Sequence, residues 1–275
     1  MLILSLPLPL LPLKVFGGEC DDGKCEDSVF HLDLDSRTWQ RLHMQGPIPT
    51  GRRDHAAVQA GSIMYMFGGQ TNGYFLDDLM SFDTRTLQIT EPGLPPIPRW
   101  EHVEISSMGG AVAPSRRAGH TLSVYEDKLY VFGGTDGEKF FNEMWCYDLH
   151  TREWSLVEAQ GHTPPGRAGH AACVVDGCIY VTGGKSATGR NLSDVVAFRI
   201  RSLRWYTFGN MGPAPAARSG HSMLSHGSKV YVFNGEAREG EDPRGVHVLD
   251  AGKIKYPAEK GPRPVTQGGL PSNMA

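Results

Sequence analysis

The chain has 275 residues, a net charge of −3 and a charged fraction of 21%. A charge this small excludes a strong electrostatic attraction of the whole molecule to nucleic acid or to a membrane surface. Its 34 glycines and 19 prolines accompany a hydrophobic fraction of 40%, so we expect turn residues of an all-β protein rather than disorder.

The first twelve residues are apolar and are interrupted by Pro7, Pro9 and Pro12. They lack the basic start and the small-residue cleavage site of a secretory leader, and they run directly into the first glycine motif described below. We therefore interpret residues 1–12 as a ragged N-terminus. The five cysteines form no zinc pattern and no convincing disulfide pair, which favours a reducing compartment. We expect a cytoplasmic protein, with a secreted one as the alternative.

A two-glycine motif recurs after short apolar runs. The first residues of successive copies are 51, 65, 50 and 51 positions apart, so one interval carries an insertion of about fourteen residues. The copies are Gly17 and Gly18, Gly68 and Gly69, Gly133 and Gly134, Gly183 and Gly184, and a decayed copy, Asn234 and Gly235. Repetition at a fixed period of about fifty residues indicates one repeated structural unit.

Other residue types keep step with the glycines. Copies two to five place a histidine thirteen residues before the motif, an arginine three residues earlier, and a proline three residues before that. The histidines are His55, His120, His170 and His221, and the arginines are Arg52, Arg117, Arg167 and Arg218. An aromatic residue stands six positions after Asp33, Asp148, Arg199 and Asp250, as Trp39, Trp154, Trp205 and Tyr256; in copy two, Ile89 follows Asp83 at this spacing.

Each copy predicts four short strands. In the fourth copy, alternating apolar residues follow His170, Asp176 and Gly177 form a two-residue turn, and three further strands follow at 179–182, 195–200 and 205–208. A single four-stranded sheet cannot bury both faces, whereas sheets packed around an axis can, which is the principle of a β-propeller. The predicted blades are 13–45, 46–91, 114–158, 159–209 and 210–257, with an inserted inter-blade loop at 92–113 and a Pro/Gly-rich tail at 258–275.

The paired glycines, the spaced arginine and histidine and the distal tryptophan resemble the kelch repeat over residues 13–256. The resemblance implies an all-β kelch-type propeller of five four-stranded blades, the first lacking its innermost strand. It is similar to the scaffold kelch domains of cell-polarity and Ras-pathway regulators, partly through the runs 246–250 and 255–257. Kelch propellers serve many tasks, so the fold alone does not identify the function.

Closure of the ring is open to two interpretations. Blade 1 lacks its first strand, which leaves an exposed sheet edge. In the tail, Pro264, Gln267 and Leu270 repeat the proline, arginine and histidine spacing in degraded form, but 271–275 does not read as a strand. We expect an incomplete propeller, with closure by the tail as the alternative.

The resemblance implies that a partner binds one face, formed by inter-strand loops at 19–28, 70–76, 135–141, 185–192 and 236–245 and by the inter-blade connections. The repeated arginines, with Arg53 and Arg116 adding charge, either capture an acidic peptide or tie neighbouring blades through backbone carbonyls. Arg99 and Trp100 in the insertion are either an exposed interface hot spot or a plug that holds the loop. The repeated histidines and distal aromatics are interpreted as structural, with the aromatics packed between blades.

Two enzyme classes share this architecture, copper-dependent galactose oxidases and iron-dependent plant specifier proteins. Their ligand patterns are missing here, and the acidic loop with Cys20 and Cys25 is better explained as a solvated loop than as a metal site. We therefore predict a non-catalytic platform for an unidentified protein partner. We expect no catalytic residue, metal or cofactor, and no nucleic-acid or membrane ligand; a propeller enzyme with a loop-assembled metal site is the alternative.

Overall fold

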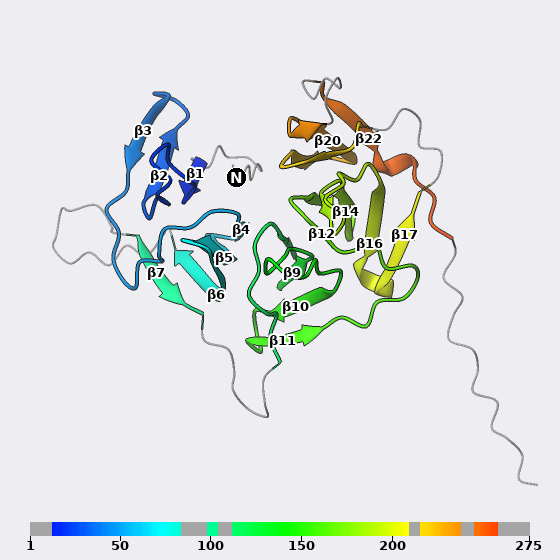
Figure 1. Ribbon diagram of the computed structural model, residues 1–275, viewed down its shortest axis with the longest axis horizontal. Coiled ribbons are helices and arrows are strands. Elements are labelled where there is room, and N and C mark those ends of the chain that lie inside the picture. Colours follow the sequence, from blue (N-terminus) through cyan, green and yellow to red (C-terminus); the bar gives the residue numbers. More distant parts are fainter. Residues whose placement is uncertain (1–12, 84–97, 104–111, 209–214, 238–244, 258–275) are drawn as a thin grey trace, which may run out of the picture.

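The computed structural model describes residues 13–83, 98–103, 112–208, 215–237 and 245–257. These residues form antiparallel strands and two single-turn 3-10 helices, η1 (Ile200–Ser202) and η2 (Ala251–Lys253). No helix among them is long and apolar enough to cross a bilayer. The main sheets are five blades around a central axis, which confirms the all-β propeller prediction (Figure 1).

Within each complete blade the strands lie in sequence order, and the first strand is innermost. Blade 1 consists of β1 (Leu13–Phe16), β2 (Val29–Asp33) and β3 (Thr38–Arg41). Blade 2 consists of β4 (Ala56–Ala60), β5 (Ile63–Thr71), β6 (Tyr74–Asp83) and β7 (Arg99–His102). Blade 3 consists of β8 (Thr121–Tyr125), β9 (Lys128–Phe132), β10 (Met144–Asp148) and β11 (Glu153–Leu156).

The last two blades follow the same order. Blade 4 consists of β13 (Ala171–Val175), β14 (Cys178–Thr182), β16 (Val195–Arg199) and β17 (Arg204–Thr207). Blade 5 consists of β19 (Ser222–His226), β20 (Lys229–Phe233) and β22 (His247–Asp250). Two short ribbons lie beside them, β12 (Arg167–Ala168) with β15 (Lys185–Ser186) and β18 (Arg218–Ser219) with β21 (Glu236–Ala237).

The turns between first and second strands set the register of each blade. Asp176 and Gly177 have φ values of 48° and 69°, as a type I′ turn requires, and Val175 pairs with Cys178 across them. The corresponding turns of the other complete hairpins also begin at positive φ, at Gly61, Glu126 and Gly227. Because register decides which face each side chain occupies, these turns place the apolar residues between the blades.

The fourth strand of blade 2 is not where the sequence analysis placed it. That strand is β7, whose Trp100 pairs with Phe82 of β6, and not a segment near Ile89. The insertion therefore lies between the third and fourth strands of blade 2, not in a 92–113 connection between blades. The prediction was wrong because it kept the usual six-residue spacing at the point where the chain is longer; residues 84–97 lie outside the described ranges.

Aromatic residues of each fourth strand pack on the preceding blade. Ring centroids lie 5.4 Å apart for Trp154 and Phe67, and 4.8 Å apart for Trp205 and Phe132. Trp100 packs on Phe16 in the same way, at 5.1 Å. Blade 5 has three strands in the described residues, and its predicted fourth strand, near Tyr256, borders residues outside them. Tyr256 nevertheless reaches blade 4, because its hydroxyl lies 2.7 Å from that of Tyr180.

Among the described residues, no strand connects blades 1 and 5 (Figure 1). In the described residues β1 pairs only with β2, so blade 1 has three strands there, as the sequence predicts. Trp39 is 53% exposed, which overturns the prediction that it packs between blades. It occupies the position of Trp154, but no described residue covers that face of blade 1. The tail residues Pro264, Gln267 and Leu270 lie outside the described ranges.

In the second, third and fourth motifs the two glycines meet two different neighbours. A Cβ atom on Gly133, whose φ is +67°, would lie 2.8 Å from the Arg167 carbonyl oxygen and 2.7 Å from His170 Cε1 in the next blade. A Cβ on Gly134 would lie 2.8 Å from His120 Cβ in its own blade. Glycine therefore satisfies both a left-handed backbone and a close approach of two segments.

Candidate functional site

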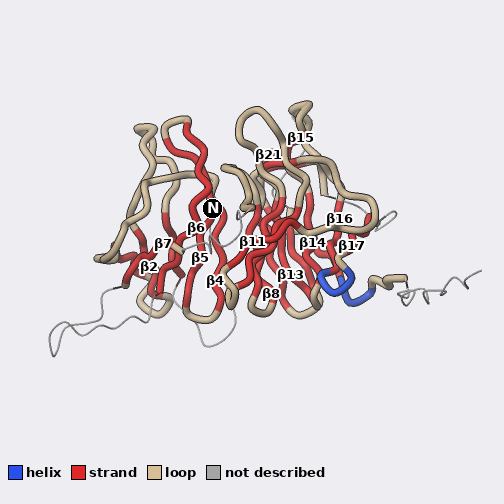
Figure 2. Tube along the Cα trace, turned by 90° about the horizontal axis from the view of Figure 1, so that it is seen from below, coloured by secondary structure: helices blue, strands red, loops and turns tan. Residues whose placement is uncertain are grey.

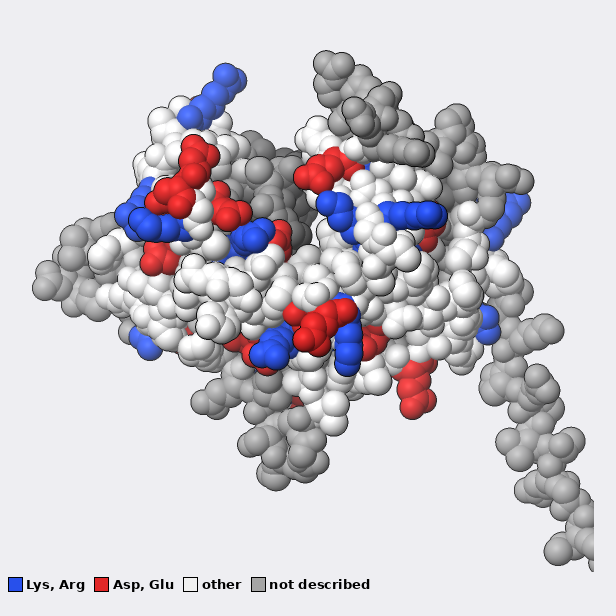
Figure 3. Space-filling view, viewed as in Figure 1, with Lys and Arg blue, Asp and Glu red and all other residues white. Residues whose placement is uncertain are grey.

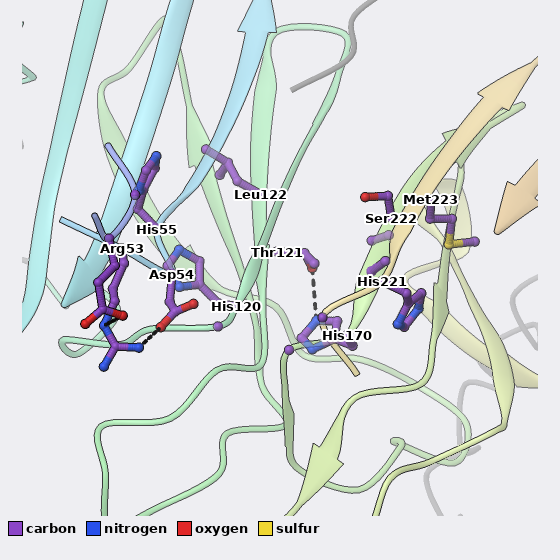
Figure 4. Close-up of a pocket in the computed structure, with 17 residues that line it drawn as sticks. Arg53, Asp54, His55, His120, Thr121, Leu122, His170, His221, Ser222 and Met223 are labelled. Atoms are coloured by element: carbon purple, nitrogen blue, oxygen red, sulfur yellow. Dashed lines mark hydrogen bonds and ion pairs between the residues drawn. The ribbon is translucent and has the colours of Figure 1, made fainter. Parts of the chain in front are cut away.

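A cavity of about 400 Å³ lies at the axis, where the innermost strands begin (Figure 4). Its walls carry the four repeated histidines, and Arg53 and Asp54 stand at its edge. The cavity is therefore built from equivalent positions of successive blades, with blade 1 contributing only Gly18 and Glu19.

Backbone hydrogen bonds run around this cavity from blade to blade. The Gly119 N–H donates to the Asp54 carbonyl at 2.8 Å, Gly169 donates to Gly119 at 2.7 Å, and Gly220 donates to Gly169 at 2.8 Å. Each bond joins the residue before one histidine to its equivalent in the next blade. The wall is thus a continuous hydrogen-bonded arc, which fixes the inner strands relative to one another.

The repeated histidines are buried and uncharged. His120 Nε2 lies 3.1 Å from the Phe67 carbonyl oxygen of the preceding blade, and His170 Nε2 lies 3.1 Å from Thr121 Oγ1. Burial is the main cause that lowers the pKa of His55 and His120 to about 3 and that of His221 to about 4, and the charge of the nearby arginine is the second cause. The pKa of His170 lies well below its usual value for the same reasons. Neutral imidazoles form no cationic ring; His120 and His170 link blades through a carbonyl and a hydroxyl group, respectively.

The repeated arginines are also buried, and their donors are used within the blade. Arg167 Nη1 donates to the Gly183 carbonyl at 3.1 Å and to Asp194 Oδ1 at 2.8 Å, and Nη2 donates to Asp194 Oδ2 at 2.7 Å. Arg52 pairs with Asp78 and Arg117 with Glu143 in the same manner, while Arg218 donates to the Asn234 carbonyl at 3.0 Å. All four side chains are at most 2% exposed, so capture of an acidic peptide by this set is wrong.

The link between blades comes from the arginine backbone instead of its side chain. The second glycine of a motif donates its N–H to the arginine carbonyl of the next blade, for example Gly134 to Arg167 at 2.8 Å and Gly184 to Arg218 at 2.8 Å. The prediction that the arginine side chain links neighbouring blades is therefore wrong. The side chain bonds within its own blade, and the arginine carbonyl oxygen makes the link to the preceding blade.

Sequence reasoning missed the acidic partners Asp78, Glu143 and Asp194. Each stands ten or eleven residues after the first glycine of its motif; Glu143 and Asp194 directly precede the third strand, and Asp78 lies within it, in β6. The signal was present, but the intervening loops differ in length and composition. Only the structure shows that these carboxylates reach the buried guanidinium groups.

The remaining candidates have different surroundings. Arg53 is half-buried at the cavity mouth, with Nε 3.5 Å from Glu19 and Nη1 3.3 Å from Asp54. Arg116 is exposed. Arg99 is exposed and pairs with Glu101 at 3.5 Å, whereas its neighbour Trp100 is fully buried. The hot-spot interpretation of Trp100 is therefore wrong, because that side chain belongs to the core between blades 1 and 2.

One loop of the predicted binding face is a regular β-hairpin. The strands β5 and β6 continue past the glycine motif to a turn at Asn72 and Gly73, whose φ values are 47° and 81°. In Figure 2 this hairpin is the tall red pair of strands at the upper left. Tyr74 at its tip is 74% exposed. An aromatic side chain on a rigid element is thus presented to solvent on this face.

Charges of both signs surround the central hollow on this face (Figure 3). Besides the Arg53 cluster, Lys185 pairs with Glu236 at 3.2 Å across blades 4 and 5. Within the described residues no group of three or more His, Cys, Asp or Glu side chains is placed to hold a metal ion, and all five cysteines are free thiols. The face offers a surface of mixed charge around the central cavity.

Antiparallel blades arranged around a central cavity define a β-propeller. The family model described as the KLHDC2/KLHL20/DRC7 Kelch-repeats domain matches residues 12–235. The chain belongs to the kelch-repeat family.

Curated relatives agree with this family. The chain is 35% identical to Tip elongation aberrant protein 1 of Schizosaccharomyces pombe over 92% of its length, and 30% identical to Kelch domain-containing protein 3 of Bos taurus over 71%. It is 27% identical to the Leucine-zipper-like transcriptional regulator 1 homolog of Drosophila melanogaster over 86%. It spans 21%, 51% and 24% of those three relatives, respectively.

Proposed function

We propose that the chain is a non-catalytic platform that binds a partner protein through the loops between second and third strands. The observation that carries this proposal is the β5–β6 hairpin, which holds Tyr74 at 74% exposure. Every blade has the same strand order, so the equivalent connections of all blades emerge on the same side of the ring, the upper side in Figure 2.

Tyr74 has the properties of an interface anchor. An aromatic residue contributes a large contact area with few rotatable bonds, and a hairpin that is already ordered loses little entropy on binding. Arg53 and Asp54, which contact Gln70 at the base of the hairpin, and Glu19 supply polar groups of both charges on this face. The five free thiols support a reducing compartment, and we place the platform in the cytoplasm.

Site-specific photo-crosslinking tests the proposed face. A photoreactive phenylalanine analogue replaces Tyr74 in one sample and Leu203 in the other; Leu203 is 41% exposed in the β16–β17 turn at the opposite end of the blades. A partner captured from lysate of the source organism is expected to crosslink from position 74 and not from 203. Crosslinking from 203 alone contradicts the proposed face.

A substitution separates binding from folding. Tyr74→Ala is expected to weaken capture of the same partner at least tenfold, while the melting temperature stays within about 1 °C because the side chain is exposed. Deletion of the 92–113 segment is not a suitable test, since it removes β7 and buried Trp100. Unchanged capture by Tyr74→Ala excludes the hairpin as the anchor.

A further inference from the structure

A second cavity, of about 480 Å³, lies in the groove between blades 2 and 3. Tyr65 and Tyr147 line its interior, and Arg99, Glu101, His102 and Arg152 line it from β7 and the β10–β11 turn. Tyr65 is near the start of β5, whereas the Tyr74 hairpin extends from the other end of that strand. The groove and the proposed binding face are therefore at opposite ends of blade 2.

Tyr147 carries a hydroxyl that the other blades lack. The strand registers place it opposite Trp154 as Phe82 is opposite Trp100 and Phe198 is opposite Trp205. Its side chain is 1% exposed, and its hydroxyl has no hydrogen-bond partner in the described part of the chain. Burying an unpaired hydroxyl is unfavourable, so this atom calls for an acceptor that the repeat does not supply.

Arg152 is a cation beside this hydroxyl. It takes the left-handed turn position, with φ of 59°, that Leu203 takes in blade 4 with φ of 48°. Arg152 forms no ion pair within the described ranges, whereas Arg99 is paired with Glu101 at 3.5 Å. The charge of Arg152 reaches both tyrosines and opposes the burial that raises the pKa of Tyr147 to about 12. Among the described residues, Arg152 is thus a cation of this groove without a counter-ion.

The next junction shows the same groove without these features. Between blades 3 and 4 the positions of Tyr147 and Arg152 are occupied by apolar Phe198 and Leu203. Lys128, a cation of blade 3 at this junction, is paired with Asp148. A buried hydroxyl and an unpaired arginine therefore occur together at the blade 2–3 junction and are replaced by apolar side chains at the 3–4 junction.

We propose that the groove between blades 2 and 3 binds an oxyanion carried on a peptide: an acidic side chain, or a phosphoryl group as the other source of the same chemistry. Arg152 supplies the charge and Tyr147 donates a hydrogen bond, because an ionised oxygen accepts from both. Ile63 and Leu149 line the same cavity, and they contact the apolar stem of the peptide side chain that carries the oxyanion. This inference rests on the proposed function only in that the peptide belongs to a partner protein.

Titration of the intact chain with three short peptides tests the groove directly. Capped tripeptides carry a central glutamate, phosphoserine or glutamine, and the readout is the Arg152 side-chain Nε–H signal in nitrogen-edited NMR spectra. The two charged peptides are expected to shift this signal and saturate, with the glutamine peptide at least tenfold weaker. Raising the salt concentration is expected to weaken both, because exposed charge pairs are screened.

Two substitutions copied from other blades identify the groups responsible, and binding is followed by peptide fluorescence. Arg152→Leu introduces the blade 4 residue and is expected to reduce affinity for the charged peptides at least tenfold. Tyr147→Phe is expected to reduce it about threefold to tenfold without lowering the melting temperature, since the lost hydroxyl has no protein partner. Arg37→Leu, in the equivalent turn of blade 1, is the matched control and is expected to leave binding unchanged.

Equal shifts with the glutamine peptide, or undiminished binding by Arg152→Leu, overturn the inference. A lower melting temperature for Tyr147→Phe also overturns it, because the hydroxyl would then have a structural role. The proposed function stands or falls separately: crosslinking from Tyr74 concerns the other end of the blades and does not depend on Arg152.

Discussion

Trp39 and Trp154 occupy the same position of the repeat and differ in what covers them. Trp154 is 8% exposed and packs on Phe67 of blade 2, whereas Trp39 is 53% exposed on the open side of blade 1. We expect Trp154→Ala to lower the free energy of unfolding by about 3–5 kcal/mol and Trp39→Ala by less than about 1 kcal/mol. Urea denaturation of the two variants measures this difference; equal losses would show that Trp39 is covered in solution.

The first glycine of each motif is a second residue-level test. Gly133→Ala places a Cβ within 2.8 Å of the Arg167 carbonyl, and we expect a loss of about 3 kcal/mol or more from strain and displacement together. Gly189 has a similar φ of +74° with nothing within 4 Å of the added atom, so Gly189→Ala is expected to cost only about 1–2 kcal/mol. Thermal unfolding compares the two variants. A similar loss of stability in both would mean that the close contact at Gly133 adds nothing to the cost of the left-handed backbone.

Asn234 shows why the motif decays in the last copy. It keeps the left-handed backbone, with φ of 62°, that asparagine tolerates better than most residues. At the four other copies a side chain here would meet the arginine and histidine of the next blade. In the described residues no such blade follows blade 5, so the steric reason for glycine is absent at this position.

Among the elements, the connection before each first strand depends on its arginine. Arg167→Ala removes the bonds to Gly183, Pro165 and Asp194, and we expect a loss of about 3 kcal/mol or more in the free energy of unfolding. Exposed Arg116 has no such role, so Arg116→Ala is expected to change stability by less than about 0.5 kcal/mol. Denaturation midpoints distinguish them; a stable Arg167→Ala protein would show that the brace is dispensable.

The innermost strands make stability depend on pH. The pKa values of His55, His120 and His221 in the folded chain are about 3, 3 and 4, below the unfolded value of about 6.5, so the unfolded chain binds more protons between these limits. Their contribution is complete above about pH 6.5 and is lost as the pH falls towards 3–4, by up to about 1.4 kcal/mol per pH unit for each histidine. Urea unfolding at about pH 7 and pH 5 measures this decline.

A single-site control identifies the groups responsible for this pH dependence. His120→Asn is expected to remove one histidine's share of the slope, and substitution of exposed His162 is expected to leave the slope unchanged. A slope that is the same in His120→Asn would assign the acid sensitivity to other groups.

At the scale of the whole molecule, the blades have unequal support. Blades 3 and 4 have four strands and a neighbour on both sides, whereas blade 1 has three strands and packs only on blade 2 in the described residues. Local opening is favoured where few apolar contacts hold an element. We expect amide hydrogens of β2 to exchange at least tenfold faster than those of β10 and β16 under native conditions. Uniform protection across these three strands would mean that the gap beside blade 1 is filled.

The repeat itself was largely readable from the chain. Strands such as β14 and β20, the turn at Asp176 and Gly177 and the packing of Trp205 depend on local alternation and turn chemistry, which fixed offsets reveal. The fourth strand of blade 2 was misplaced because an insertion broke the offset. The carboxylates that pair with Arg52, Arg117 and Arg167 were missed because the segments between them and the glycine motif differ in length, composition and local structure.

The sequence by itself determined the blade, its number of copies and the kelch family, because these follow from short-range patterns repeated every fifty residues or so. Only the tertiary structure decided which charged and aromatic residues are available to a partner. Burial depends on which segments meet across blade junctions, and identical repeat positions meet different neighbours. Trp100 is therefore core and Trp39 surface, and Arg117 is a buried brace while Arg152 is exposed.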